Sequence, residues 1–339
     1  MKDFDYIQPE TAKDAARFLE GPGWTNERAR AFAGGQDLYG EMKTGLVAPA
    51  ALVNLKAFED GAEGQIERLP DGNLSLGALV RLSVLCALPG DSAQTTLLRE
   101  AAVTVASPQV RSRATLGGNL CQRPRCLYYR RPEILCLKKG GDECFAYSGN
   151  NKYNAILGGG PSFIVHPSDL APALVALDAR VAITSPSGVT EMALADFFTL
   201  PSDADVTREN VLAPDHVLTQ VTTHLPGGLD WRATYVKFQE REGFDFALSA
   251  VALALGLKGG RVAAARVVLG GVAPKPWRTE AAEAQLVGSW RGDEGGFERL
   301  TASVAEAALA GAEPLERNAY KIPLTKGLIR RALQHLLLS

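Results

Sequence analysis

Apolar and polar positions along the first two thirds of the chain predict short helices and strands in turn. Thr11 and Asp14 have the spacing of a capping box, and apolar residues then recur at helical spacing. Apolar runs at 30–33 and 51–55 predict strands, and an Asp-Gly turn at 71–72 predicts a hairpin. The rest of this region predicts helices at 77–88, 94–105 and 172–178, a hairpin folded at 185–188, and a strand at 217–225. This mixture is typical of an α+β protein.

A different pattern follows the loop at 226–230, which we interpret as a domain boundary. Three apolar stretches after it predict strands at 231–239, 245–257 and 261–271, and helical spacing then predicts helices at about 279–287, 295–311 and 319–338. The chain is therefore predicted to form one domain over residues 1–225 and a smaller sheet-plus-helices domain over residues 226–339.

Composition and charge exclude several classes of protein. Hydrophobic residues make up 46% of the chain and charged residues 22%, which is ordinary for a globular protein. The net charge of −2 gives no reason to expect nucleic acid as a partner, and no apolar run is long enough to cross a bilayer. One segment is different, because residues 111–139 hold eight basic residues and the single acid Glu133. We expect these basic residues to stabilise bound anions or to dock a partner subunit.

Residues 107–154 show little periodicity and contain four of the five cysteines, in the spacing C-x4-C-x9-C-x7-C from Cys121 to Cys144. A segment this long without regular structure should be functional or fixed in place by something. Four crowded cysteines in a large chain favour a metal site over disulfides. Thiolates hold either zinc or a cubane cluster, and the spacing alone slightly favours zinc. Cys86 lies on an apolar helical face and is interpreted as a small buried hydrophobe.

Two glycine pairs are candidates for binding phosphate. Gly34-Gly35 follows a predicted strand, and Gly117-Gly118 lies between hydroxyl and amide side chains. Glycine lets backbone N–H groups approach a phosphate closely, so two such loops suit a ligand with two phosphates. Neither loop has the spacing of a Rossmann or mononucleotide loop, which disfavours those folds.

The segments AGGQDL, TLGGN and HPSDLAPALVALDA resemble the flavoprotein subunit of the molybdenum hydroxylase family, which includes xanthine dehydrogenase, carbon monoxide dehydrogenase and bacterial aldehyde oxidoreductases. YVKF and the C-terminal helices also fit, so the resemblance covers nearly the whole chain. It implies an α+β fold with a two-lobed FAD-binding domain of the vanillyl-alcohol-oxidase type, with lobes at about 1–57 and 58–225. The C-terminal domain would resemble that of the carbon monoxide dehydrogenase flavoprotein and cover the flavin.

The resemblance also implies which residues hold the cofactors. The implied FAD set is Ala31, Phe32, Ala33, Gly34, Gly35, Gln36, Asp37, Leu38, Ser107, Thr115, Gly117, Gly118, Asn119, Asp169, Leu218 and Lys237. Gln36 departs from the Thr or Asn more frequent in the family. Without the resemblance, Asp169 would equally be a helix cap and Lys237 a solvated strand residue.

An insert of about residues 120–155 is implied to hold a 4Fe-4S cluster. Its ligands would be Cys121, Cys126, Cys136 and Cys144. CQRPRC resembles the version found in the flavin subunit of aldehyde oxidoreductases, and the insert lies between two flavin-binding motifs. This placement favours iron-sulfur over zinc.

We therefore expect an electron-transfer subunit of an oxidoreductase, with no catalytic residue assigned in this chain. In a heterotrimer, it would take electrons from a 2Fe-2S small subunit fed by a molybdenum-cofactor large subunit, and FAD would pass them to an external acceptor. Two alternatives are a self-sufficient flavin oxidase or reductase and a zinc-stabilised binding or scaffold protein. The N-terminal residues show no signal sequence, so we expect a periplasmic complex exported on a partner's signal, or otherwise a cytoplasmic one.

Overall fold

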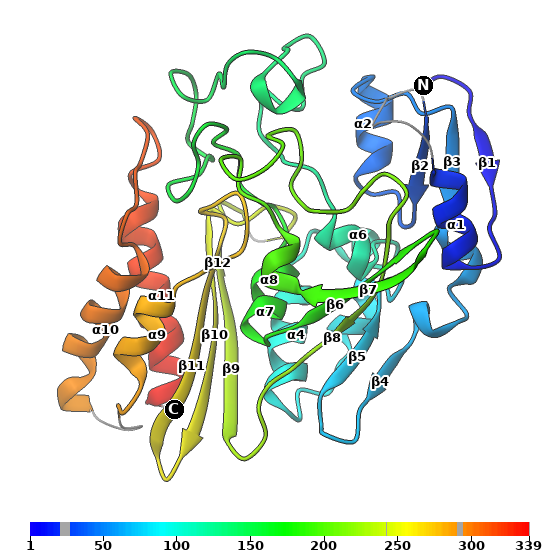
Figure 1. Cartoon of the computed structure of the whole chain (residues 1–339). Coiled ribbons are helices and arrows are strands. Elements are labelled where there is room, and N and C mark those ends of the chain that lie inside the picture. Colours follow the sequence, from blue (N-terminus) through cyan, green and yellow to red (C-terminus); the bar gives the residue numbers. More distant parts are fainter. Residues whose placement is uncertain (21–27, 242, 290–293, 339) are drawn as a thin grey trace.

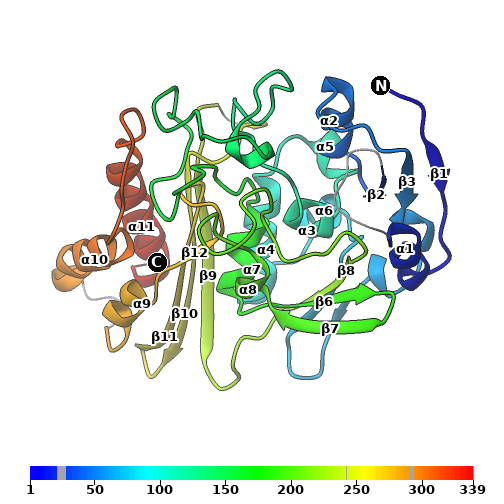
Figure 2. The ribbon, with the colours of Figure 1, turned by 45° about the horizontal axis from the view of Figure 1, so that its top comes forward.

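The computed structural model describes residues 1–20, 28–241, 243–289 and 294–338, and within them the chain forms three sheets (Figure 1). Each sheet comes from a different region of the sequence. The first lies at the N-terminal end, the second is central, and the third is backed by the C-terminal helices. The irregular segment that contains the four cysteines lies over one end of these sheets, as both views show (Figures 1 and 2).

The first sheet is parallel, with the strand order β1-β3-β2. Its strands are β1 (Asp5–Ile7), β2 (Ala29–Phe32) and β3 (Ala51–Asn54), and its helices are α1 (Ala12–Leu19) and α2 (Leu38–Thr44). The Thr11 side chain accepts a hydrogen bond from the backbone N–H of Asp14 at 3.1 Å, which confirms the predicted cap. The apolar face of α1 is buried against the sheet, as its spacing predicts.

The second sheet is antiparallel, with the strand order β4-β5-β8-β6-β7. Its strands are β4 (Ile66–Arg68), β5 (Leu74–Gly77), β6 (Arg180–Ser185), β7 (Gly188–Ala193) and β8 (Val217–Thr222). The helices of this region are α3 (Leu82–Cys86), α4 (Ala93–Val103), α5 (Pro108–Arg111), α6 (Leu116–Leu120), α7 (Leu170–Ala176) and α8 (Leu194–Phe197). Short 3₁₀ turns lie at Leu55–Phe58, Ala62–Gly64 and Leu137–Lys139.

The helix predicted over 77–88 is wrong in its first turn. It begins only at Leu82, because the backbone before it pairs with distant segments. The Ala78 N–H donates to the carbonyl of Thr219 at 2.9 Å, and the Leu79 N–H donates to that of Glu63 at 2.7 Å. Tertiary partners therefore override the local helical pattern here.

The third sheet is antiparallel, with the order β12-β11-β10-β9, and lies between helices of both regions (Figure 1). Its elements are β9 (Asp230–Phe238), β10 (Ser249–Lys258), β11 (Arg261–Gly270), β12 (Trp277–Arg278), α9 (Glu280–Leu286), α10 (Glu294–Ala308) and α11 (Lys321–Leu337). Along β10 the residues alternate in size. Ala250, Ala252 and Ala254 pack into the core around α4 and α7, whereas Val251 and Leu253 pack towards the C-terminal helices.

Residues 121–169 form the irregular segment, which we call the cysteine segment because it contains the four clustered cysteines. Its only regular element is the turn at Leu137–Lys139. Two residues at the start of α11, Asn318 just before it and Lys321 at its first position, hold the later part of this segment. The Asn318 side-chain amide donates to the carbonyls of Asn154 and Ala155, both at 3.1 Å. The buried Lys321 ammonium donates to the carbonyls of Tyr153 at 3.0 Å and Gly271 at 2.7 Å. The C-terminal region therefore holds one end of this segment.

Candidate functional site

A cavity of about 520 Å³ lies between the two glycine motifs. This volume is within the range of small-molecule and cofactor sites. All eight residues of 31–38 line it, together with Leu218 and four of the residues predicted from the second loop: Thr115, Gly117, Gly118 and Asn119. Sequence reasoning therefore placed two separate loops at one site, and the structure brings them together there.

The two glycine motifs touch each other at Gly34. A Cβ atom built on Gly34 would lie 2.3 Å from the carbonyl oxygen of Arg113 and 2.9 Å from the Cα of Ala114. Real Cβ contacts are never this short, so only glycine allows this backbone approach. The neighbouring Gly35 has φ +70°, a conformation that favours glycine as well. The first glycine pair is therefore required by the geometry of the cavity wall.

The second motif packs tightly against the floor of the cavity. The Gly117 N–H donates to the carbonyl of Ala78 at 2.7 Å, and a Cβ on Gly117 would lie 3.0 Å from the Cβ of Ala78. The Thr115 hydroxyl accepts from the Gly118 N–H at 3.2 Å, and the Asn119 side-chain carbonyl accepts from the Ser168 hydroxyl at 2.5 Å. The hydroxyl and amide groups of this motif thus fix its own loop and tie it to the start of α7.

Three predicted FAD residues do not line the cavity. Asp169 and Lys237 form a buried ion pair, 2.9 Å between Nζ and Oδ2, and the Tyr235 hydroxyl donates to the other oxygen of Asp169 at 2.8 Å. Lys237 also donates to the carbonyl of Thr104 at 2.9 Å. Ser107 caps α5. The expected direct contacts of these residues with FAD stay predictions, and in this structure Asp169 and Lys237 join the two sequence regions.

Asp169 does not cap α7 with its side chain, so that alternative is wrong. The Ser168 hydroxyl accepts the Ala171 N–H at 2.9 Å in its place. Lys237 is not solvated either, because its side chain is only 2% exposed. The reason is that β9 runs against α4 and buries this part of its length. Burial, followed by the neighbouring Asp169 charge, raises the pKa of Tyr235 well above its usual value.

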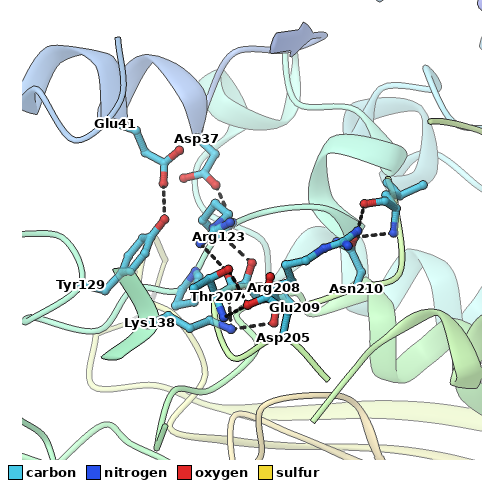
Figure 3. A network of polar contacts seen from close by, with 12 residues as sticks. Asp37, Glu41, Arg123, Tyr129, Lys138, Asp205, Thr207, Arg208, Glu209 and Asn210 are labelled. Atoms are coloured by element: carbon cyan, nitrogen blue, oxygen red, sulfur yellow. Dashed lines mark hydrogen bonds and ion pairs between the residues drawn. The ribbon is translucent and has the colours of Figure 1, made fainter. Parts of the chain in front are cut away.

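Ion pairs and hydrogen bonds tie the cysteine segment to the first lobe, and Figure 3 shows Asp37 beside Arg123 and Glu41 beside Tyr129. Asp37 accepts from Arg125 at 2.5 Å, from Arg130 at 2.7 Å and from the backbone N–H of Arg123 at 2.6 Å. Burial alone would raise the pKa of Asp37, but Arg125 and Arg130 more than offset this and hold it below its usual value. Tyr129 adds a bond from its hydroxyl to Glu41 at 3.1 Å.

A second set of ion pairs centres on Glu209, whose side chain is 3% exposed. Lys138 lies 2.9 Å from one carboxylate oxygen and Arg123 lies 3.1 Å from the other. Burial lowers the pKa of Lys138, an effect that Glu209 opposes. Part of the basic segment therefore pairs with acids of the chain itself, and the expected role of these residues towards bound anions or partners stays a prediction. Acids at positions 37, 41 and 209, distant in sequence, neutralise much of its charge.

The four candidate cysteine ligands are free thiols, and three of them pack in two different surroundings. Cys126 and Cys136 pack into one small cluster with Leu46 and Tyr129. Cys121, at the end of α6, lines the cavity and packs against the main core, and burial raises the pKa of its thiol to about 12. Within the described ranges, no three His, Cys, Asp or Glu side chains are grouped so as to hold a metal ion.

The two expected cofactors therefore fit to different degrees. FAD fits, because the cavity has the required size, its wall requires glycine, and five arginines line it against three acids. The cysteine segment has the right donor chemistry, four thiols on one segment beside the cavity, but it does not assemble them into one group. Cys86 packs against the main core as predicted for a small hydrophobe, but it is only partly buried.

Sequence reasoning missed two stretches of the cavity wall. One is the segment 208–217, which contributes arginine, asparagine and histidine side chains. The other is the loop between β9 and β10, which contributes Phe244 and Phe246. No motif marked the first. For the second, the two aromatic residues in an otherwise polar loop were an available signal.

Two family models together match nearly the whole chain. The FAD binding domain in molybdopterin dehydrogenase matches residues 2–226, and the CO dehydrogenase flavoprotein C-terminal domain matches residues 233–336. This fold with this cavity defines a flavin-binding subunit of an oxidoreductase. The chain belongs to the FAD-binding subunits of the molybdenum hydroxylase family. The α+β fold with these two domain types is thereby confirmed.

Several relatives match over most of their length. Aldehyde oxidoreductase FAD-binding subunit PaoB of Escherichia coli K12 is 35% identical over 98% of both chains. The glyceraldehyde dehydrogenase medium chain of Sulfolobus acidocaldarius is 26% identical over 86% of this chain and 84% of its own. Among solved structures, quinoline 2-oxidoreductase from Pseudomonas putida 86 matches with a TM-score of 0.73 at 25% identity, covering 100% of this chain and 99% of that chain.

The family assignment excludes one of the two alternatives to an electron-transfer subunit, the zinc-stabilised scaffold. A zinc-stabilised scaffold, in which the glycines are only turns, is not compatible with membership of a flavoprotein family whose relatives are oxidoreductase subunits. No helix in the described parts of the chain is long and apolar enough to span a membrane.

Proposed function

We propose that the cavity between the glycine motifs is the FAD site of this subunit. The observation that carries the proposal is the backbone approach of Gly34 to Arg113, because it joins both motifs in one wall of the cavity. Five arginines against three acids in the lining give a surplus of positive charge, which suits a pyrophosphate. Leu218 and the apolar residues beside it suit the flavin ring. FAD, when bound, accepts electrons and passes them on.

A single methyl group at Gly34 tests the FAD site. In Gly34→Ala the Cβ would collide with the Arg113 carbonyl, so the two motifs must separate. We expect the dissociation constant for FAD to rise at least about tenfold, which corresponds to about 1.4 kcal/mol. The measurement is titration of flavin-free protein with FAD, followed by flavin absorbance.

Gly40→Ala is the matched control. Gly40 lies inside α2, outside the cavity lining, and a Cβ there would meet no atom within 4 Å. FAD affinity should be unchanged, and the helix should gain about 0.5–1 kcal/mol of stability. Wild-type affinity in Gly34→Ala would exclude this cavity wall as the phosphate site.

We further propose that Cys121, Cys126, Cys136 and Cys144 hold a 4Fe-4S cluster. Their number and placement within one segment support this, as does the position of Cys121 in the cavity lining, which would bring the cluster next to the flavin. Thiolates in such a segment need the metal to draw them together. Iron and acid-labile sulfide analysis of anaerobically purified protein should give about four of each per chain. Zinc without iron would contradict the proposal, whatever the flavin content.

The third part of the proposal concerns partners and the direction of electron flow. We infer that the chain works as the medium subunit of a heterotrimer, taking electrons from a 2Fe-2S subunit that is fed by a molybdenum subunit acting on aldehydes. The names of the relatives, FAD-binding subunit and medium chain, support this. Aldehyde should therefore bleach the flavin absorbance only in the assembled complex. Bleaching by aldehyde in the isolated subunit would indicate a self-sufficient enzyme.

A further inference from the structure

Two strained residues meet at the cavity. Among the described residues, only Ala106, Asp178 and Phe244 have a positive φ without being glycine, with φ values of 43°, 49° and 71°. Side chains rarely adopt this left-handed conformation, because the Cβ approaches the following carbonyl oxygen. Strain of this kind persists only where the surrounding structure imposes it, and it gathers at functional sites.

Ala106 and Phe244 come from different regions of the chain and contact each other. The backbone N–H of Phe244, in the loop after β9, donates to the carbonyl of Ala106 at 3.2 Å, and both residues line the cavity. Phe246 lines it too, and its ring centroid lies 5.0 Å from the Cζ of Arg125. The C-terminal domain therefore contributes an aromatic pair to a site otherwise built by the first domain.

These two rings are large apolar groups left in contact with water. Phe244 is 61% exposed and Phe246 is 43% exposed. The loop that carries them is braced from both sides, since Arg241 pairs with Asp245 at 2.8 Å and the Leu248 N–H donates to the carbonyl of Phe238 at 2.9 Å. A braced loop that holds an exposed ring in a strained conformation is arranged to present that ring to something.

We propose that Phe244 and Phe246 form the outer wall of the FAD site, packing against the isoalloxazine ring and shielding it from water and small solutes. The assignment to the ring end follows from position. Phe246 stacks on Arg125 of the cysteine segment, and Cys121 of that segment lines the same cavity, so this is the end at which electrons would leave or enter the flavin. Aromatic side chains stack well on such a planar ring. The inference rests on the proposed FAD site and on the proposed cluster, whose ligand Cys121 marks this end of the cavity.

The experiment compares Phe244→Ala and Phe244→Gly with the wild type. The glycine variant removes the ring and also relieves the left-handed strain, so its melting temperature should equal or exceed that of the wild type. In both variants the FAD dissociation constant should rise about tenfold. Quenching of the bound flavin's fluorescence by iodide should also increase about twofold or more, because the ring is then open to solvent.

Phe238→Ala is the control, because Phe238, the last residue of β9, is also an exposed phenylalanine but does not line the cavity. It should leave both measurements at wild-type values. Wild-type FAD affinity together with wild-type iodide quenching in Phe244→Gly would overturn the aromatic wall. The proposed FAD site would be contradicted by different results: a wild-type chain that binds no FAD, or Gly34→Ala binding FAD with wild-type affinity.

Discussion

The buried carboxylate of Glu209 allows a sharp prediction about how the cysteine segment is held. Its two oxygens contact Lys138 at 2.9 Å and Arg123 at 3.1 Å, and the side chains of Glu209 and Lys138 are 3% and 2% exposed. In Glu209→Gln two cations lose their charged partner and keep only backbone carbonyls, and one of them, Lys138, is almost fully buried. Removing one member of a buried ion pair costs about 3–5 kcal/mol, and we expect a loss in that range.

Removing the lysine instead of the glutamate should lower the free energy of unfolding by less. In Lys138→Met, Glu209 keeps its contact with Arg123, and the Arg208 carbonyl loses its bond from Lys138 at 2.7 Å. The expected loss is about 1.5–3 kcal/mol, the contribution of hydrogen bonds to charged groups. In the double variant Lys138→Met/Glu209→Leu no enclosed charge is left at these two positions. Arg123 keeps its bond to the carbonyl of Thr207 at 3.0 Å. The double variant should therefore be at least about 1 kcal/mol more stable than Glu209→Gln.

The assay is urea denaturation of the flavin-free chain, with the rate of thiol modification at the buried Cys136 as a local probe of the segment. Glu298→Gln is the control, because it breaks an ion pair with Arg330 whose members are 68% and 48% exposed, and the unfolding midpoint should barely move. The reasoning is refuted if Glu209→Gln unfolds at the wild-type midpoint, or if the double variant is less stable than the single one.

Two further predictions concern pH. Burial lowers the pKa of His166 to about 3, so the unfolded chain binds a proton below pH 6.5 that the folded chain does not. The free energy of unfolding should fall by about 1.4 kcal/mol per pH unit from 6.5 towards 3, and His166→Gln should remove that slope from urea midpoints. Burial lowers the pKa of Lys321 to about 7, so unfolding becomes less favourable as pH rises from 7 to 10. Lys321→Met should abolish this rise; a persisting slope in the variant would assign it to other groups.

Much of the proposed FAD site could be predicted from the sequence, because its chemistry is carried by short contiguous motifs. Residues 31–38 and the glycines at 117 and 118 need special backbone geometry, and glycine is the visible sign of that need. Their convergence on one cavity was implied by the resemblance and by the argument that two loops suit two phosphates.

Other parts of the site depend on long-range packing and left little trace in the sequence. The approach of β9 to α4 buries Lys237 beside Asp169, and neither strand pattern nor charge indicates which partner a lysine will find. The same holds for Glu209, which meets Lys138 and Arg123 only through the fold. The basic residues of 111–139 looked like a patch because their neutralising acids lie far away in sequence.

The alternation of small and large residues along β10 has a consequence for how this protein is organised as a folding unit. The alanines at 250, 252 and 254, with Tyr235 of β9, belong to the same core as α4 and α7 of the first domain. The two family models divide the chain between residues 226 and 233, yet the largest core crosses that line. The two halves match separate family models, but they share one interior, so neither half buries all of its apolar surface without the other.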